Sequence, residues 1–151
     1  MTHRMVTAVL ALIGFFVSLY LWLWKLGLMG PLVCTTGGCE TVQLSEYAVF
    51  FGVPVALWGV LGFTSLLVVS LAGLQNRWVE QRGPTVLLAV LSAIGVGFVG
   101  YLTYLEAAVI HAWCQWCLVC AGLVTIIFLT SLVTLRTWPA VRAQAQRRGP
   151  S

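Results

Sequence analysis

Residues 107–135, AAVIHAWCQWCLVCAGLVTIIFLTSLVTL, contain no charged side chain. Toward the N-terminus, three further stretches are equally free of charge: Met5–Trp24, Tyr47–Asn76 and Gly83–Leu105. A helix rises about 1.5 Å per residue and the hydrocarbon layer of a bilayer is about 30 Å thick, so about 20 apolar residues cross it once. The sequence therefore predicts an all-α integral membrane protein with a bundle of four transmembrane helices.

The composition excludes several other classes of protein. Of the 151 residues, 60% are hydrophobic and only 8% are charged, whereas soluble globular chains carry about 25% charged residues. A soluble fold and intrinsic disorder are therefore excluded. The first apolar stretch exceeds the roughly 7–15 residues of a signal-peptide core, so we expect it to be a retained span. We predict one membrane domain over 1–151, with spans at about 5–26, 54–74, 84–110 and 115–136, an outer loop at 27–53 and a cytoplasmic tail at 137–151.

The basic residues predict the orientation. With four spans, all the arginines fall on the side of the two termini and the middle loop, and only Lys25 lies opposite. The positive-inside rule makes the arginine-rich side cytoplasmic. The net charge of +4 is thus a topology signal that also suits lipid headgroups, and it does not indicate nucleic-acid binding. The arginines are Arg4, Arg77, Arg82, Arg136, Arg142, Arg147 and Arg148.

The cysteines carry the candidate chemistry at the opposite, outer side. Cys114 and Cys117 form a C-x-x-C at the start of the last span, where the helix N-terminus stabilises a thiolate. A second pair, Cys34 and Cys39, lies in the first outer loop, and two glycines between them give the backbone freedom to close a small ring. Two dithiols that meet can exchange electrons through mixed disulfides.

Interpretations without redox activity also remain open for these cysteines. The loop pair alone could form an inert structural disulfide, and four thiolates could bind zinc, although an oxidising compartment disfavours this and we predict no metal. Cys120 creates an overlapping Cys117-Leu-Val-Cys120 pair, but a free cysteine one turn deeper is more often a small buried hydrophobe.

In its ordered motifs the chain resembles the vitamin K epoxide reductase (VKOR) family, in particular its bacterial thiol-oxidoreductase branch. The resemblance covers nearly the whole chain and rests on the loop cysteine pair, on Ser45 six residues after Cys39, on Phe51-Gly52-Val53-Pro54 leading to Gly59, and on Cys114-Gln-Trp-Cys117 opening the last span.

The resemblance implies an oxidoreductase whose helices surround a quinone of the ubiquinone, menaquinone or vitamin K type. It implies that Cys34/Cys39 oxidises a thioredoxin-like periplasmic protein and that Cys114/Cys117 reoxidises the loop pair and reduces the quinone. By analogy Cys117 faces the quinone and Cys114 receives a loop cysteine. Within the loop pair, we expect Cys39 to meet the partner and Cys34 to meet Cys114.

Two departures from the family pattern narrow the function. Relatives with a fused thioredoxin-like domain are common, but only residues 137–151 follow the last span here, so we expect a separate partner protein. Animal members carry an asparagine and a tyrosine where Ala48 and Ala121 stand. Quinone reduction is therefore preferred to vitamin K epoxide reduction.

Further residues are assigned around the expected quinone pocket. We predict that the segment from Glu40 to Phe51 is a short interfacial helix that covers the pocket, with Ser45 capping that helix or bonding to the loop. Glu106 and His111 are candidates to relay protons, and snorkelling at the interface is the alternative. For Trp116 the alternative is a role in the aromatic belt at the membrane interface. The candidate cofactor-binding residues are Phe50, Phe51, Trp116, Cys117 and Ala121.

Three functions are consistent with this sequence. The first is a quinone-coupled generator of protein disulfides. The second is reduction of vitamin K or its epoxide through the same cysteine relay. The third, from a different class, is a membrane scaffold whose loops are stapled by inert disulfides, in which case replacing Cys117 would leave function intact.

Overall fold

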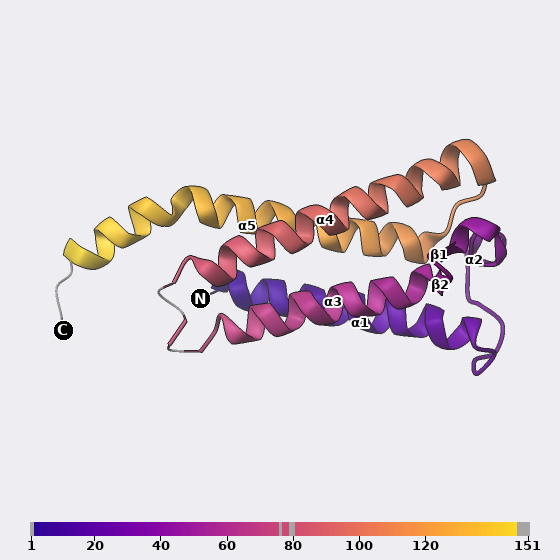
Figure 1. The fold of residues 1–151 in the computed structure, drawn as a ribbon, viewed down its shortest axis with the longest axis horizontal. Helices are drawn as coiled ribbons and strands as arrows, with labels where there is room; N and C mark the ends of the chain where they lie inside the picture. The colour runs from indigo at the N-terminus through magenta and orange to yellow at the C-terminus, as the bar shows by residue number, and fades with distance from the viewer. Residues whose placement is uncertain (1, 76, 79–80, 148–151) are drawn as a thin grey trace.

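Four long helices lie side by side in the computed structural model, which describes residues 2–75, 77–78 and 81–147 (Figure 1). They are α1 (Thr2–Lys25), α3 (Val55–Ala72), α4 (Gly83–Leu105) and α5 (Gln115–Arg147). Within the described residues, four helical segments are long and apolar enough to cross a membrane. The prediction of a four-helix membrane bundle is confirmed.

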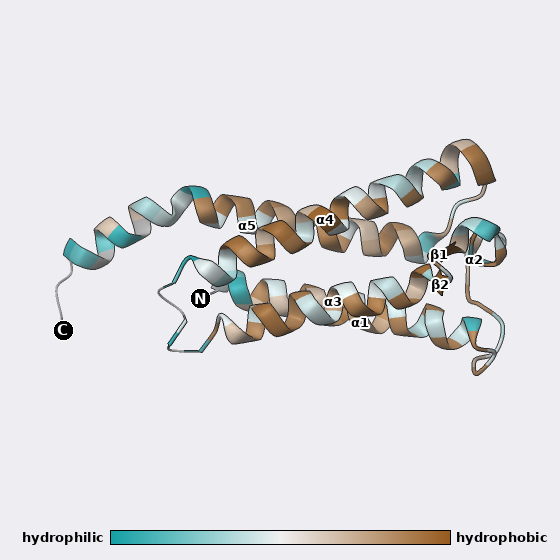
Figure 2. Cartoon of the chain, in the orientation of Figure 1, coloured by the Kyte–Doolittle hydropathy of each residue, from teal (hydrophilic) through white to brown (hydrophobic). Residues whose placement is uncertain are grey.

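The surface of the bundle is apolar along its middle. Bulky side chains such as Phe16, Ile94 and Val133 are more than half exposed, as expected where helices face lipid instead of water. Hydrophilic residues gather in the connecting loops and toward the end of α5 (Figure 2). This distribution fits a bundle whose hydrophobic band is covered by acyl chains.

Small residues allow the helices to approach each other inside the bundle. α1 packs against α3 and α5, and α4 packs against α5. A Cβ atom at Gly14 would overlap the Phe63 ring, so glycine permits this close contact between α1 and α3. Close packing of this kind takes the place of the hydrophobic driving force that lipid does not provide. The buried core is formed by Ala11, Phe63, Leu66, Leu88, Val124 and Ile127.

At the arginine-rich end, Arg4 ties the middle loop to α1. Its guanidinium is 2% exposed and donates to the carbonyl oxygens of Gly73 and Gln81 and to the Thr85 hydroxyl. Gly73 follows the last residue of α3, so the cation also faces the negative end of that helix dipole. An arginine that the sequence marks as a topology signal therefore holds the fold together as well.

The first outer loop differs from the prediction of one interfacial helix between Glu40 and Phe51. The helix there, α2 (Cys39–Leu44), has six residues, and it is followed by a 3-10 turn, η1 (Glu46–Ala48). The chain then forms a small antiparallel hairpin from β1 (Val49–Phe50) and β2 (Val53–Pro54). Phe51 and Gly52 turn the hairpin with positive φ angles of 52° and 74°, a conformation that a continuous helix would not permit.

The last two helices are joined by a tight connection. After α4 the chain makes a π-helical turn, η2 (Glu106–Ile110), which ends at His111 in the left-handed conformation with φ 55°. α5 then begins at Gln115 and continues through Pro139 to Arg147, beyond the end predicted for the fourth span. Helix α5 therefore includes residues 137–147 of the predicted tail, and residues 148–151 lie outside the described residues.

Candidate functional site

The four predicted active cysteines meet in one apolar cluster at the outer end of the bundle. Cys39 and Cys114 belong to its buried part, and Cys34 and Cys117 pack against it. Both buried cysteines have an exposed fraction of 0%. The cluster thus brings a loop pair and a helix pair together although about 75 residues separate them in the chain.

A set of polar contacts docks the loop on the start of α5. The Thr35 amide donates to the Gln115 side-chain oxygen at 3.0 Å, and the Thr36 hydroxyl donates to the Trp113 carbonyl at 2.7 Å. The Trp116 indole donates to the Val33 carbonyl at 2.7 Å. Because these partners flank the cysteines on both sides, the loop is held in register with the C-x-x-C.

Gly38 makes the closest approach between the two segments. A Cβ atom at this position would lie 2.7 Å from both the nitrogen and the oxygen of Trp113, and a backbone cannot yield as a flexible side chain can. Gly37 supplies the neighbouring turn with φ 74°, a value that L-residues with side chains rarely adopt. The two neighbouring glycines therefore meet different requirements, a positive φ angle at Gly37 and close backbone packing at Gly38.

Gly38→Ala is expected to undock the loop and to slow electron transfer between the two cysteine pairs by about tenfold or more, the cost of about 1–3 kcal/mol for an overpacked contact. The measurement is the rate at which a reduced loop pair is reoxidised, followed by quenching and alkylation. Gly30→Ala, where a Cβ atom meets nothing within 4 Å, is the matched control. Equal rates for Gly38→Ala and wild type would contradict the docking role.

The loop pair forms a disulfide, and its two sulfurs are differently placed. Cys34 and Cys39 are bonded, with their Cα atoms 6.0 Å apart, and the Cys39 amide donates to the Cys34 sulfur at 3.3 Å. Cys39 is fully buried as the first residue of α2, whereas Cys34 is partly exposed. An attacking thiolate must reach the sulfur it attacks, so this conformation leaves Cys34 more accessible than Cys39. The expectation that Cys39 meets a partner protein stays untested.

The helix pair consists of two free thiols at the start of α5. Cys114 immediately precedes the helix, and its carbonyl accepts the amide of Leu118 at 3.1 Å. A hydrogen bond from the Cys117 thiol is the main cause that lowers the pKa of Cys114 from 9.0 to about 7. Burial and the Glu106 carboxyl oppose this shift. Cys114 is thus the thiol of the pair that ionises near neutral pH.

Glu106 lies beneath the pair. Its side chain is 2% exposed, and one carboxyl oxygen accepts the Cys114 amide at 3.1 Å. This burial excludes the alternative in which Glu106 snorkels to the interface. His111 is exposed and lines neither of the two pockets that Glu106 lines.

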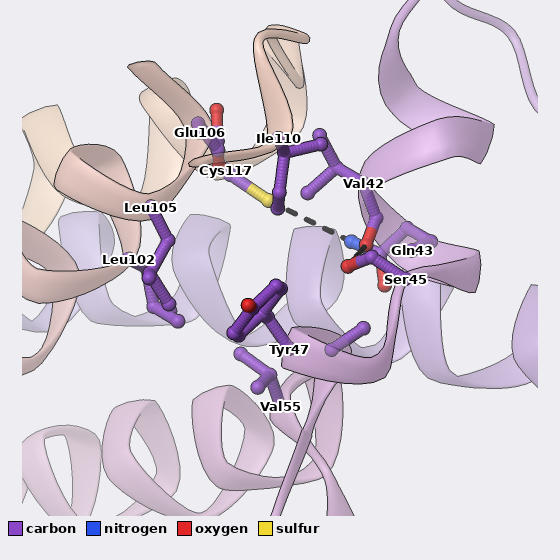
Figure 3. A pocket seen from close by; sticks show the side chains of 11 residues that line it. Val42, Gln43, Ser45, Tyr47, Val55, Leu102, Leu105, Glu106, Ile110 and Cys117 are labelled. Atoms are coloured by element: carbon purple, nitrogen blue, oxygen red, sulfur yellow. Dashed lines mark hydrogen bonds between the residues drawn. The ribbon is translucent and has the colours of Figure 1, made fainter. Parts of the chain in front are cut away.

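Two adjoining pockets meet at Cys117. One of about 320 Å³ opens beneath α2 and η1, and Figure 3 shows Gln43, Glu106 and Cys117 around it. The second, of about 530 Å³, lies deeper between the helices. Five residues line both pockets: Gln43, Val55, Leu102, Glu106 and Cys117. The space beside Cys117 is therefore mostly apolar with two convergent polar side chains.

A third hollow continues toward the lipid-facing surface. It is a groove of about 1100 Å³ along α3 and α4, lined almost entirely by apolar side chains. Gly59, Phe63, Phe98 and Val99 line both this groove and the deeper pocket. An apolar route therefore runs from the bundle surface to the neighbourhood of Cys117.

The other residues predicted to bind a cofactor do not line the two pockets at Cys117. Phe50 lines the groove and stacks edge-on against Trp58 and Phe98. Phe51 is 84% exposed at the hairpin tip. Trp116 packs against Tyr20 on the loop side, and neither Trp116 nor Ala121 lines the two pockets at Cys117.

Two further predictions concern Ser45 and Cys120. Ser45 ends α2 and its hydroxyl donates to the Val42 carbonyl at 2.7 Å, so it caps the C-terminus of the short helix. Cys120 lines the deeper pocket, with its sulfur 3.8 Å from the Ser18 hydroxyl. Within the described residues, no group of three or more His, Cys, Asp or Glu side chains is arranged to hold a metal ion.

Gln43 is the site residue that the sequence analysis missed. Its side chain is 4% exposed, and its amide nitrogen donates to the Cys117 sulfur at 3.6 Å (Figure 3). An uncharged polar residue four positions after Cys39 points along the same helix face as that cysteine. This spacing was the available signal, but the partner of the amide lies 74 residues away.

A bundle of four membrane-length helices with a disulfide docked against a dithiol is the architecture of a membrane thiol-disulfide oxidoreductase. The model of the vitamin K epoxide reductase family matches residues 5–132. The chain belongs to this family, whose members are oxidoreductases of the membrane that use quinones and act with a redox partner.

Proposed function

We propose that this protein generates disulfides in a periplasmic thioredoxin-like protein and passes the electrons to a membrane quinone. The observation that carries the proposal is the docking of the Cys34–Cys39 disulfide on the Cys114/Cys117 dithiol, with Cys117 lining a pocket. An inert loop staple would not need a second cysteine pair beside it.

The exposed fractions of the sulfurs support an order for the relay. A partner thiolate attacks the partly exposed Cys34, which releases Cys39 as a thiolate, and the second partner thiol then resolves the mixed disulfide. The partner leaves oxidised and the loop pair holds two electrons. Cys39, buried beside Cys114 in the same cluster, attacks an oxidised Cys114–Cys117 bond at Cys114, and Cys34 resolves that mixed disulfide. The helix pair is now reduced.

The pocket residues fit a quinone ring and its apolar tail. Small-ligand sites combine apolar walls with a few convergent polar groups, and Gln43 and Glu106 supply such groups here. A bound quinone would accept the two electrons and two protons that the Cys114/Cys117 dithiol gives up as its disulfide re-forms. Glu106, beside both cysteines, is placed to take and pass protons.

The arginine distribution supports the orientation in the proposal. The Arg4 end of the bundle carries most basic residues, and the cysteine cluster lies at the opposite end (Figure 1). By the positive-inside rule the cysteines face the exterior of a bacterial plasma membrane, where disulfides persist.

The experiment that tests this function uses the purified protein in detergent with a reduced thioredoxin-like protein as electron donor. Ubiquinone, menaquinone and vitamin K epoxide analogues are offered separately as acceptors. We expect absorbance changes that report consumption of quinone, in equal amounts with the donor disulfide formed, and little turnover of the epoxide. No consumption with any acceptor, together with unaltered loop disulfides, would favour the scaffold function instead.

The low pKa of Cys114 predicts how the helix pair responds to pH. Since the thiolate is the form present above a pKa of about 7, alkylation of Cys114 in the reduced protein should rise about tenfold from pH 5.5 to 6.5 and level off above pH 8. Mass spectrometry of the alkylated peptide measures the rate. Cys117→Ala removes the main stabilising hydrogen bond and should move the inflection toward the ordinary value. An inflection near 9 in wild type would contradict the prediction.

A further inference from the structure

Helix α2 carries one cysteine of the loop pair and one side chain that contacts the helix pair. Cys39 of the loop disulfide is its first residue, and Gln43 lies one helical turn further on. The Gln43 amide nitrogen reaches the Cys117 sulfur at 3.6 Å, and the side chain is buried. Apart from the Glu106 carboxyl, the side chains packed around the pair are mostly apolar, so a buried amide directed at one of its sulfurs stands out.

The position of Gln43 is held by contacts outside the pocket. The Lys25 ammonium, at the end of α1, donates to the Gln43 backbone carbonyl at 2.7 Å. The Ser45 hydroxyl donates to the neighbouring Val42 carbonyl. Both bonds satisfy carbonyls at the C-terminus of a short helix, and the positive charge suits that end of the helix. The amide is therefore directed at Cys117 by a fixed backbone.

A hydrogen-bond donor beside Cys117 stabilises the two redox states of the helix pair to different extents. The reduced pair carries negative charge near neutral pH, because the pKa of Cys114 is lowered to about 7, and the Gln43 amide donates to the sulfur of the paired Cys117. A hydrogen bond to a charged group favours that charged form, whereas a disulfide sulfur is only a weak acceptor. The amide thus stabilises the dithiol more than the disulfide, and stabilising the reduced form makes a pair more oxidising.

We propose that Gln43 is a positioning residue that makes the Cys114/Cys117 disulfide a stronger oxidant of the loop pair by donating a hydrogen bond to the reduced sulfurs. This inference rests on the proposed relay and assigns the step that it favours, the transfer of two electrons from Cys34/Cys39 to Cys114/Cys117.

The test is an equilibrium titration of the full-length protein in glutathione buffers. Two glutathione thiols reduce one protein disulfide to a dithiol and become one glutathione disulfide, and differential alkylation with mass spectrometry reads each cysteine pair separately. Gln43→Met, which keeps the length and loses the donor, should lower the equilibrium constant for reduction of Cys114/Cys117 about tenfold, or about 30 mV for a two-electron couple. The constant of Cys34/Cys39 should stay within about twofold.

Two further variants keep the outcome decisive. Gln43→Glu places a negative charge beside the thiolate and should lower the constant at least as far as Gln43→Met. Glu40→Gln changes an exposed residue of the same helix and should leave both constants unaltered. Thermal melting identifies a variant that fails to fold, in which case the other Gln43 variant decides.

An unchanged constant in folded Gln43→Met or Gln43→Glu protein, or an equal shift in Glu40→Gln, would overturn the role of Gln43. The titration needs neither quinone nor partner protein. Failure of this inference is therefore distinct from failure of the proposed function, which appears as an absence of quinone consumption by wild type.

Discussion

Cys117→Ser is expected to abolish quinone reduction, with a loss of about a thousandfold or more. A serine hydroxyl cannot form the disulfide through which the helix pair is oxidised, and removal of a reacting nucleophile commonly costs an enzyme several powers of ten. Cys117 is also the only one of the four relay cysteines that lines the pockets. The measurement is the rate of quinone consumption with a reduced thioredoxin-like donor.

The same variant should accumulate a covalent intermediate. With Cys117 gone, the Cys114 thiolate can attack the loop disulfide at Cys39, which breaks the Cys34–Cys39 bond and releases Cys34 as a thiolate. Cys117 is then no longer there to resolve the Cys39–Cys114 bond. Non-reducing peptide mapping should recover a Cys39–Cys114 bond. A bond between Cys34 and Cys114 would restore the opposite assignment of the loop cysteines.

Cys120→Ser is the matched control. Cys120 lies on the same helix and lines the deeper pocket, but its contact is with the Ser18 hydroxyl. We expect this variant to keep most of the activity, because serine preserves the size and the hydrogen-bonding capacity of the side chain. Loss of activity in Cys120→Ser equal to that in Cys117→Ser would transfer the active pair to Cys117 and Cys120.

Glu106→Gln should lower kcat about a hundredfold while leaving the fold intact. Oxidation of the dithiol releases two protons and reduction of a quinone consumes two, and general acid-base groups contribute about 10²–10⁴-fold to such transfers. An amide retains the size of the carboxyl and its acceptor for the Cys114 amide, but it cannot carry a proton. Steady-state kinetics at several pH values measure the effect.

The pattern of the kinetic loss separates a proton carrier from a structural residue. We expect Glu106→Gln to retain the thermal stability of wild type and to lose the pH dependence of kcat that the carboxyl contributes. His111→Ala, at an exposed position, should behave as wild type. Unchanged kcat in Glu106→Gln would exclude the carboxyl from proton transfer.

Prediction from sequence was most accurate for the long helices. Hydropathy is a property of each segment and requires no knowledge of its neighbours, and the helices begin and end within a few residues of the predicted spans, apart from the extension of α5. It was least accurate between Glu40 and Phe51, where Ser45 in an extended conformation and the turn at Phe51 divide the expected helix into three short elements.

In the candidate site, too, some residues were predicted from the sequence and others were not. The C-x-x-C at a helix start and the loop pair were recognisable from residue type and spacing, as was Glu106 from its charge in an apolar span. Gln43 was not recognisable, because the role of its amide depends on the sulfur that it faces, and only the structure shows that contact. Phe51 and Ala121 were assigned to the pocket, and the folded chain places them away from it.

The amino-acid order alone was enough for the membrane class, the number of spans and the presence of two cysteine pairs, since length, hydropathy and charge act locally. The burial of Cys39, the exposure of Cys34 and the contact of Gln43 with Cys117 arose from the docking of the first outer loop on α5. Those contacts join residues about 75 to 80 positions apart, and no local pattern encodes which of two neighbouring sulfurs will face inward when such segments pack.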